Sequence, residues 1–130
     1  NRPWQHVLEP LHGYLILGEK IYKEPKRYSG PWNFGTTTNT VTNVLKIVKE
    51  IVKFWGKGKI NFKKNQKYYE QINLQLNINK SKKILKWKPK YSITKSIHVT
   101  VDWYKKVLIE KYNVEKITAK QIKEYMNESK

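Results

Sequence analysis

Apolar residues recur at helical spacing in several long segments of this 130-residue chain. We predict one helix over residues 10–23, because Pro10 is tolerated in a first helical turn, where its missing N–H would have no partner. The clearest amphipathic stripe follows later in the chain and consists of Val41, Val44, Leu45, Val48, Ile51, Val52 and Trp55. Hydroxyl groups at residues 36–40 should cap this second helix, and Gly56 and Gly58 should end it.

Three further helical segments are predicted in the second half of the chain. Residues 80–85 allow one or two helical turns before a proline. Ser92 or Thr94 should cap a longer helix, whose inward positions are Ile97, Val101, Tyr104 and Leu108. Thr118 and Gln121 have the spacing of a capping box, which predicts a short final helix carrying Ile122 and Tyr125.

Four short segments have strand character: residues 4–8, 32–35, 60–62 and 72–78. The last has the cleanest pattern, because Ile and Leu alternate strictly with Asn and Gln, as in a strand with one buried face. Strand and helix patterns alternate along the chain, which favours an α/β fold over a helical bundle or a β-sandwich. Only four short strands are visible, so we expect a segment of a longer protein.

Charge adds two competing interpretations. The formal net charge is +17, and 25 of the 27 basic residues are Lys, with Arg only at positions 2 and 27. A Lys-rich, solvent-exposed surface explains this excess of Lys over Arg, since proteins that recognise nucleic acids usually favour the planar guanidinium of Arg. A face that binds nucleic acid or another acidic partner, without catalysis, stays open as the alternative. The hydrophobic fraction of 38% is too high for a disordered basic tail.

Several kinds of site are disfavoured by the residues present. His6, His12 and His98 fall at no metal-ligand spacing, and we interpret each as a polar edge residue. Paired carboxylates for acid–base chemistry are missing, because Asp102 is the sole Asp and the Glu residues are scattered. The glycines at 56 and 58 follow a predicted helix and precede a predicted strand, which reverses the order of a dinucleotide-binding loop. Three Tyr-x-x-x-Lys pairs occur, about as many as chance gives with 9 Tyr and 25 Lys.

Cysteine is absent, so a disulfide framework and a thiolate zinc site are excluded, and we expect a cytoplasmic protein. The longest apolar stretch, near residues 14–17, is far too short to span a bilayer, and we expect no membrane association.

Several segments in order resemble a known enzyme family. They are RPWQHVLEPL at 2–11, GYL at 13–15, YSGPWNFG at 28–35, LQLN at 74–77, SK at 81–82, LKWKP at 85–89 and TVDWY at 100–104. This series is similar to the C-terminal part of extended short-chain dehydrogenases that act on nucleotide sugars, above all CDP-glucose 4,6-dehydratases. The resemblance covers residues 1–108, and residues 109–130 would form a helical C-terminal extension.

The resemblance implies the last helix and strand of a Rossmann domain, followed by a small α/β substrate-binding lobe. In this family the reaction converts CDP-glucose to CDP-4-keto-6-deoxyglucose, with NAD bound by an N-terminal part that this chain lacks. The catalytic and NAD-binding motifs also lie in that part, so we expect no dehydratase turnover from this chain alone, marginal stability and a large exposed apolar patch. The whole enzyme should be a homo-oligomer.

Three substrate-binding residues follow from the resemblance. Arg2 should contact the substrate pyrophosphate, which suits a guanidinium that can form two parallel bonds to an anion. Lys67 and Glu70 fall where sister epimerases place a basic and an acidic residue before the alternating strand. The local sequence here is KYYEQ at 67–71 rather than the HPHEA expected of the CDP-glucose branch, so only Glu70 matches.

Overall fold

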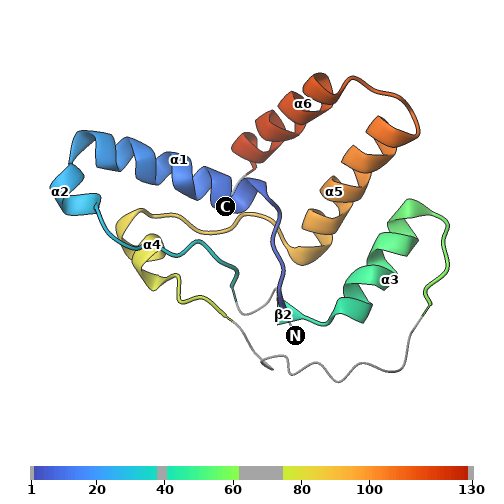
Figure 1. The fold of residues 1–130 in the computed structure, drawn as a ribbon, viewed down its shortest axis with the longest axis horizontal. Coiled ribbons are helices and arrows are strands. Elements are labelled where there is room, and N and C mark those ends of the chain that lie inside the picture. The colour runs from blue at the N-terminus through green and yellow to red at the C-terminus, as the bar shows by residue number, and fades with distance from the viewer. Residues whose placement is uncertain (1, 38–40, 62–74, 129–130) are drawn as a thin grey trace.

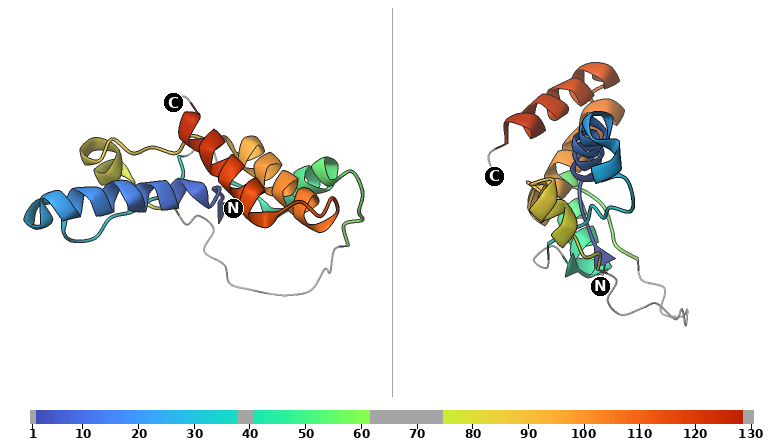
Figure 2. Two further views of the ribbon diagram at one scale, coloured as in Figure 1. Left: turned by 90° about the horizontal axis from the view of Figure 1, so that it is seen from above. Right: turned by 90° about the vertical axis from the view of Figure 1, so that its left-hand side faces the viewer.

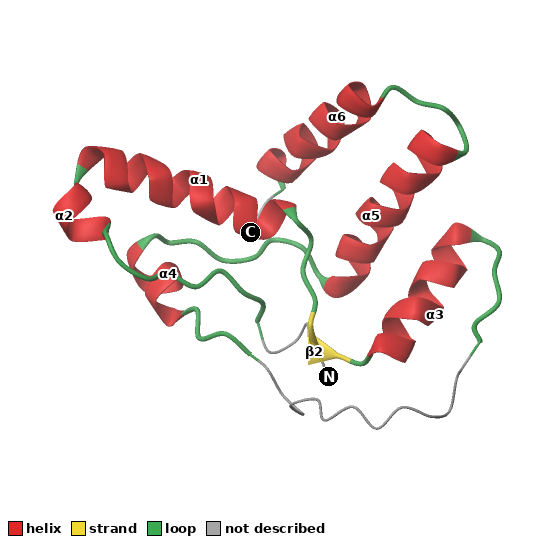
Figure 3. Ribbon diagram, viewed as in Figure 1, coloured by secondary structure: helices red, strands yellow, loops and turns green. Residues whose placement is uncertain are grey.

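The computed structural model describes residues 2–37, 41–61 and 75–128. Helices dominate this part of the chain (Figures 1 and 3). In chain order the elements are β1 (Arg2–Pro3), α1 (Leu8–Lys23), α2 (Pro25–Tyr28), β2 (Val41–Thr42), α3 (Val44–Trp55), α4 (Asn79–Ile84), α5 (Ile93–Leu108) and α6 (Val114–Asn127).

The helices form two groups joined by extended segments. Helix α5 lies between α3 and α6 and contacts both, whereas α1 turns into α2 at the other end of the molecule, beside α4 (Figures 1 and 2). Strands β1 and β2 pair antiparallel, with Arg2 opposite Thr42. They form one two-stranded sheet, which places the chain start next to the beginning of α3.

Each of the two groups of helices has its own hydrophobic cluster. One contains the buried side chains Tyr28, Phe34, Leu85 and Trp87. The other joins α3 to α5 through Ile47, Ile97 and Val101. In the first cluster the ring of Phe34 packs edge-on against Trp87, with ring centroids 5.1 Å apart. The same ring lies directly against Gly13 of α1, where a Cβ atom would overlap it.

Helices α1, α3, α4 and α5 occur where the sequence predicts them. Of the predicted inward positions of α5, Ile97 and Val101 are buried, whereas Tyr104 and Leu108 are exposed, so the prediction is wrong for these two. Gly56 ends α3 in the left-handed conformation, with φ of +87°, and donates its N–H to Val52. The cap of α3 is Asn43, which accepts a bond from the N–H of Lys46, and not a hydroxyl from residues 36–40. Ser92 caps α5 as predicted, by accepting from the N–H of Lys95.

The start of the final helix was predicted wrongly. Helix α6 begins at Val114, after an Asn113 cap that accepts from the N–H of Lys116. Thr118 and Gln121 therefore lie inside the helix, where their side chains bond to α5 and not to the helix end. The capping-box spacing occurs here by coincidence, because a better cap precedes it by five residues.

The α/β prediction is not confirmed, since the described residues contain only the β1–β2 pair. Residues 4–8 do not form a strand, because α1 begins at Leu8. Residues 32–35 and 75–78 are irregular and lie next to one another, joined by a bond from the Asn33 amide to the Asn77 carbonyl, without a strand ladder. Residues 60 and 61 are also irregular, and residues 62–74 lie outside the described part. An alternating pattern makes a strand only where a neighbouring backbone edge is available for pairing.

Candidate functional site

Arg2 is half-buried in β1, where the start of the chain pairs with β2. From there the backbone runs through Gln5 to His6 and enters α1 at Leu8. The other two predicted substrate-binding residues, Lys67 and Glu70, lie outside the described residues. The grouping of these three side chains therefore stays a prediction.

The start of α1 holds the most buried charged side chain of the described chain. Glu9 is only 1% exposed. Its carboxylate accepts hydrogen bonds from the backbone N–H groups of Lys90 (3.0 Å) and Tyr91 (2.7 Å), and from the Tyr125 hydroxyl (2.7 Å). Its backbone carbonyl accepts a bond from the Trp87 indole at 3.2 Å. A buried carboxylate is stable when several donors replace its hydration, so Glu9 joins three distant segments.

Tyr125 brings helix α6 to this centre. Its side chain is 1% exposed, and burial together with the bond to Glu9 raises the pKa of its hydroxyl far above the ordinary value. The ammonium group of Lys90 donates to the carbonyls of Tyr125 (2.9 Å) and Met126 (3.1 Å), in the last turn of α6. A cation at a helix C-terminus is favourable because the last carbonyls have no partner within the helix. Glu9, Lys90 and Tyr125 thus fix the end of α6 against the start of α1.

His6 is buried next to Glu9, so the interpretation as an edge residue is wrong for this histidine. Its Nδ1 accepts a bond from the N–H of Leu8 (3.3 Å), and its ring meets Tyr91 edge-on with centroids 5.7 Å apart. Burial lowers the pKa of the imidazole, an effect that the charge of Glu9 opposes. The ring is therefore neutral near pH 7, with its proton on Nε2.

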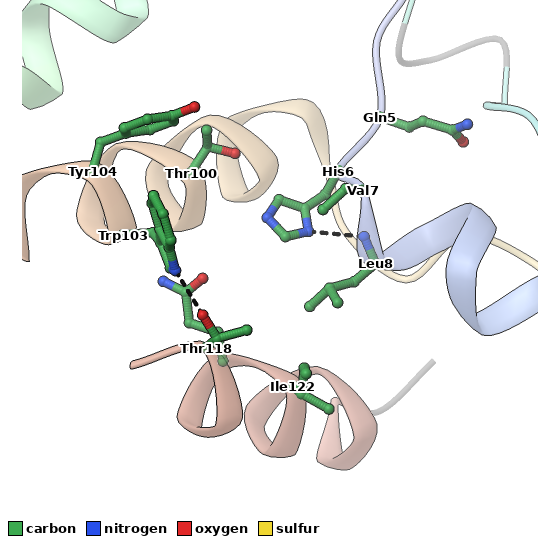
Figure 4. A pocket seen from close by; sticks show the side chains of 10 residues that line it. Gln5, His6, Val7, Leu8, Thr100, Trp103, Tyr104, Thr118 and Ile122 are labelled. Atoms are coloured by element: carbon green, nitrogen blue, oxygen red, sulfur yellow. Dashed lines mark hydrogen bonds between the residues drawn. The ribbon is translucent and has the colours of Figure 1, made fainter. Parts of the chain in front are cut away.

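A hollow of about 440 Å³ lies between the start of α1, α5 and α6 (Figure 4). It is lined by Gln5, His6, Val7, Leu8, Thr100, Trp103, Tyr104, Thr118, Gln121 and Ile122. The indole of Trp103 donates to the hydroxyl of Thr118 at 3.0 Å, which ties α5 to α6 across one end of the hollow. A second, more apolar hollow of about 380 Å³ lies between α3 and α5, with Trp4 on its wall.

Sequence reasoning missed the centre formed by Glu9 and Tyr125. The available signal was the position of Glu9, a lone carboxylate in an otherwise apolar run just before a proline. The partners of Glu9 could not be found in the same way, because they lie 78 to 116 residues further along the chain.

Other kinds of site are not supported by the described residues. They contain no group of three or more His, Asp or Glu side chains that could hold a metal ion. None of their helices is both long and apolar enough to cross a membrane.

No protein-family model matches this chain. The chain is 34% identical over 105 residues to a CDP-glucose 4,6-dehydratase from Salmonella typhimurium. The match covers 80% of this chain, and the chain spans only 29% of the length of that relative. The chain is thus similar over most of its length to the C-terminal region of a CDP-glucose 4,6-dehydratase, which confirms the resemblance that its motifs indicated.

Proposed function

We propose that this chain is the substrate-binding C-terminal portion of an NAD-dependent CDP-glucose 4,6-dehydratase, which converts CDP-glucose to CDP-4-keto-6-deoxyglucose. The observation that carries the proposal is the identity of 34% over 105 residues to an enzyme of that name. The whole enzyme, as we propose it, is a homo-oligomer.

Arg2 is the proposed contact with the substrate pyrophosphate. It lies in β1, where backbone pairing with β2 fixes the main chain and restricts the positions that the guanidinium can reach. Arg can form two parallel hydrogen bonds to a phosphate, whereas the many Lys side chains act only as point charges. Lys67 and Glu70 are the proposed further contacts of the same substrate.

NAD belongs, in this proposal, to the part of the enzyme outside this chain. The described glycines do not suit a dinucleotide site, because Gly56 ends α3 instead of preceding a helix whose N–H groups could face a pyrophosphate. We therefore derive no step of the reaction through NAD from this chain. Its own contribution is to bind and orient the nucleotide sugar.

An apolar stripe on α1 supports the placement of this chain within a larger enzyme. Leu15 is 73% exposed and Tyr22 is 89% exposed, and Leu11 and Tyr14 are also exposed. Val7, the residue just before α1, extends the stripe and is 62% exposed. Apolar surface gains about 25 cal/mol per Å² when it is removed from water. Because the chain spans 29% of the relative's length, we assign this stripe to contact with the remaining, N-terminal part of the dehydratase.

A titration of CDP and of single-stranded DNA at several salt concentrations tests the proposal against a nucleic-acid-binding module. Saturable binding of CDP, with only weak binding of DNA, supports the nucleotide-sugar function. DNA binding that weakens steeply with rising salt, in a chain that does not bind CDP, contradicts the nucleotide-sugar function. Such a salt dependence arises because contacts with the phosphates of a strand release counterions.

A further inference from the structure

The strand that carries Arg2 is too short to keep its place by pairing alone. Strands β1 and β2 contain two residues each. Pro3 lies opposite Val41 but has no backbone N–H to donate to the pair. Two paired strands are at most marginally stable in water unless a helix packs against them. A defined position of the Arg2 guanidinium therefore requires a further contact near the start of the chain.

Trp4 supplies this contact. It follows Arg2 by two residues, so the two Cα atoms are at most about 7 Å apart. The partly buried indole of Trp4 packs against the hydrophobic cluster that joins α3 to α5. Ile47 of that cluster lies in the first turn of α3, only five residues after Thr42 at the end of β2. One side chain thus attaches β1 to the helix that directly follows the partner strand of β1.

Packing, and not a hydrogen bond, makes this attachment. The indole N–H of Trp4 is buried and has no hydrogen-bond partner among the described residues. The hollow of about 380 Å³ beside the indole is lined mainly by apolar side chains of α3 and α5. An aromatic ring contributes a large contact area with few rotatable bonds. A phenyl ring at position 4 should therefore retain the attachment, whereas a shorter aliphatic side chain should loosen it.

From these contacts we propose that Trp4 is a positioning residue for Arg2, because it anchors β1 to the α3–α5 cluster and so holds the guanidinium in place before a ligand binds. This deepens the proposed function and rests on it for the identity of the ligand. A group that is already ordered loses less conformational freedom on binding, which raises the affinity without a new contact. Trp4 acts only through Arg2 and forms no contact with the nucleotide.

Isothermal titration of the 130-residue chain with CDP tests this role. Trp4→Leu should raise the dissociation constant about two- to tenfold, the effect expected when binding must order a segment that is no longer held. Trp4→Phe should restore most of the wild-type affinity. Trp55→Leu is the matched control, because Trp55 packs against the same cluster and lines the same hollow but belongs to the end of α3. It should leave the affinity unchanged, in samples that circular dichroism shows to be folded.

A double substitution separates positioning from a general structural effect. In a chain that carries Arg2→Ala, Trp4→Leu should cause no further loss of CDP affinity, because no guanidinium is left to position. Losses of equal size with and without Arg2 overturn the inference. Unchanged affinity of Trp4→Leu, or an equal loss in Trp55→Leu, overturns it as well.

NMR contacts between protons of Arg2 and Thr42, which lie opposite one another in β1 and β2, test the anchor without a ligand. These contacts should weaken in Trp4→Leu and persist in Trp4→Phe and Trp55→Leu. Contacts that persist in Trp4→Leu overturn the inference even in a chain that binds CDP. Absence of CDP binding by the folded wild-type chain contradicts the proposed function instead, and the contacts then still decide whether Trp4 anchors β1.

Discussion

The hydroxyl of Tyr125 donates a 2.7 Å hydrogen bond to the buried carboxylate of Glu9, 116 residues earlier in the chain. The same carboxylate accepts from the backbone of Lys90 and Tyr91. One acidic side chain therefore fixes the start of α1, the segment before α5 and the end of α6. Helix α6, which the family resemblance treated as an extension, is joined to Glu9 of the RPWQHVLEPL run by its most buried side chain, Tyr125.

Removal of this hydroxyl should destabilise the fold. Tyr125→Phe leaves a buried carboxylate oxygen without one of its donors, which costs about 1–3 kcal/mol. Urea unfolding followed by circular dichroism measures the change in the free energy of unfolding. Tyr112→Phe is the control, because Tyr112 is exposed and is not part of either hydrophobic cluster. Equal stability of the Tyr125→Phe variant and the wild-type chain would show that Glu9 does not depend on this donor.

The Lys90 ammonium should stabilise the last turn of α6. Lys90→Met keeps most of the apolar stem but removes the bonds to the carbonyls of Tyr125 and Met126, at a cost of about 1 kcal/mol. Hydrogen exchange at the end of α6 should become faster. Lys88→Met, at an exposed position in the same segment, should not change it. Slower or unchanged exchange in Lys90→Met would contradict this role.

Two glycines of α1 should respond in opposite directions to the same substitution. A Cβ at Gly13 overlaps the buried ring of Phe34, so Gly13→Ala should destabilise the chain by about 1–3 kcal/mol. Gly18 has open space around it, and Gly18→Ala should stabilise the helix by about 0.5–1 kcal/mol. Thermal unfolding of both variants measures the difference. A higher melting temperature for Gly13→Ala than for Gly18→Ala would refute the close packing of α1 on Phe34.

His6 should make the fold sensitive to mild acid. Burial lowers its pKa in the folded chain, so the unfolded chain takes up a proton first as the pH falls past about 6.5. The free energy of unfolding should therefore decrease from pH 7 toward pH 5, and His6→Gln should reduce that slope. His98→Gln, at an exposed site of α5, should retain it. A slope that survives in His6→Gln would assign the acid sensitivity to other groups.

The parts of the fold that could be predicted from sequence are those with local causes. The helix α3 and the caps at Gly56 and Ser92 depend on residues a few positions apart, and the structure contains them. The face that α3 buries was predicted less well, because Ile47 is buried outside the predicted stripe, whereas Val44 and Ile51 within it are exposed. The prediction of a strand at 32–35 is wrong because pairing depends on a distant backbone edge, and the neighbouring residues 75–78 offer a bond to the Asn33 side chain without a strand ladder.

The candidate site shows the same limit. Arg2 was predicted from the resemblance, and its place in β1 is now known, whereas its partners Lys67 and Glu70 are still predictions. The pairing of Glu9 with Tyr125 had no local signal, since burial of a carboxylate depends on donors that only the folded chain brings together.

The affinity for CDP after substitution of each arginine tests the central claim most directly, because the chain has only two. Arg27 is exposed on α2 and paired with Glu24 at 3.1 Å, which makes it the matched control for net charge. Isothermal titration should show that Arg2→Ala weakens CDP binding at least about tenfold, as for a lost charge-assisted bond, while Arg27→Ala binds as the wild-type chain does. Equal affinities of the two variants would contradict the assignment of this chain as the part that binds the nucleotide.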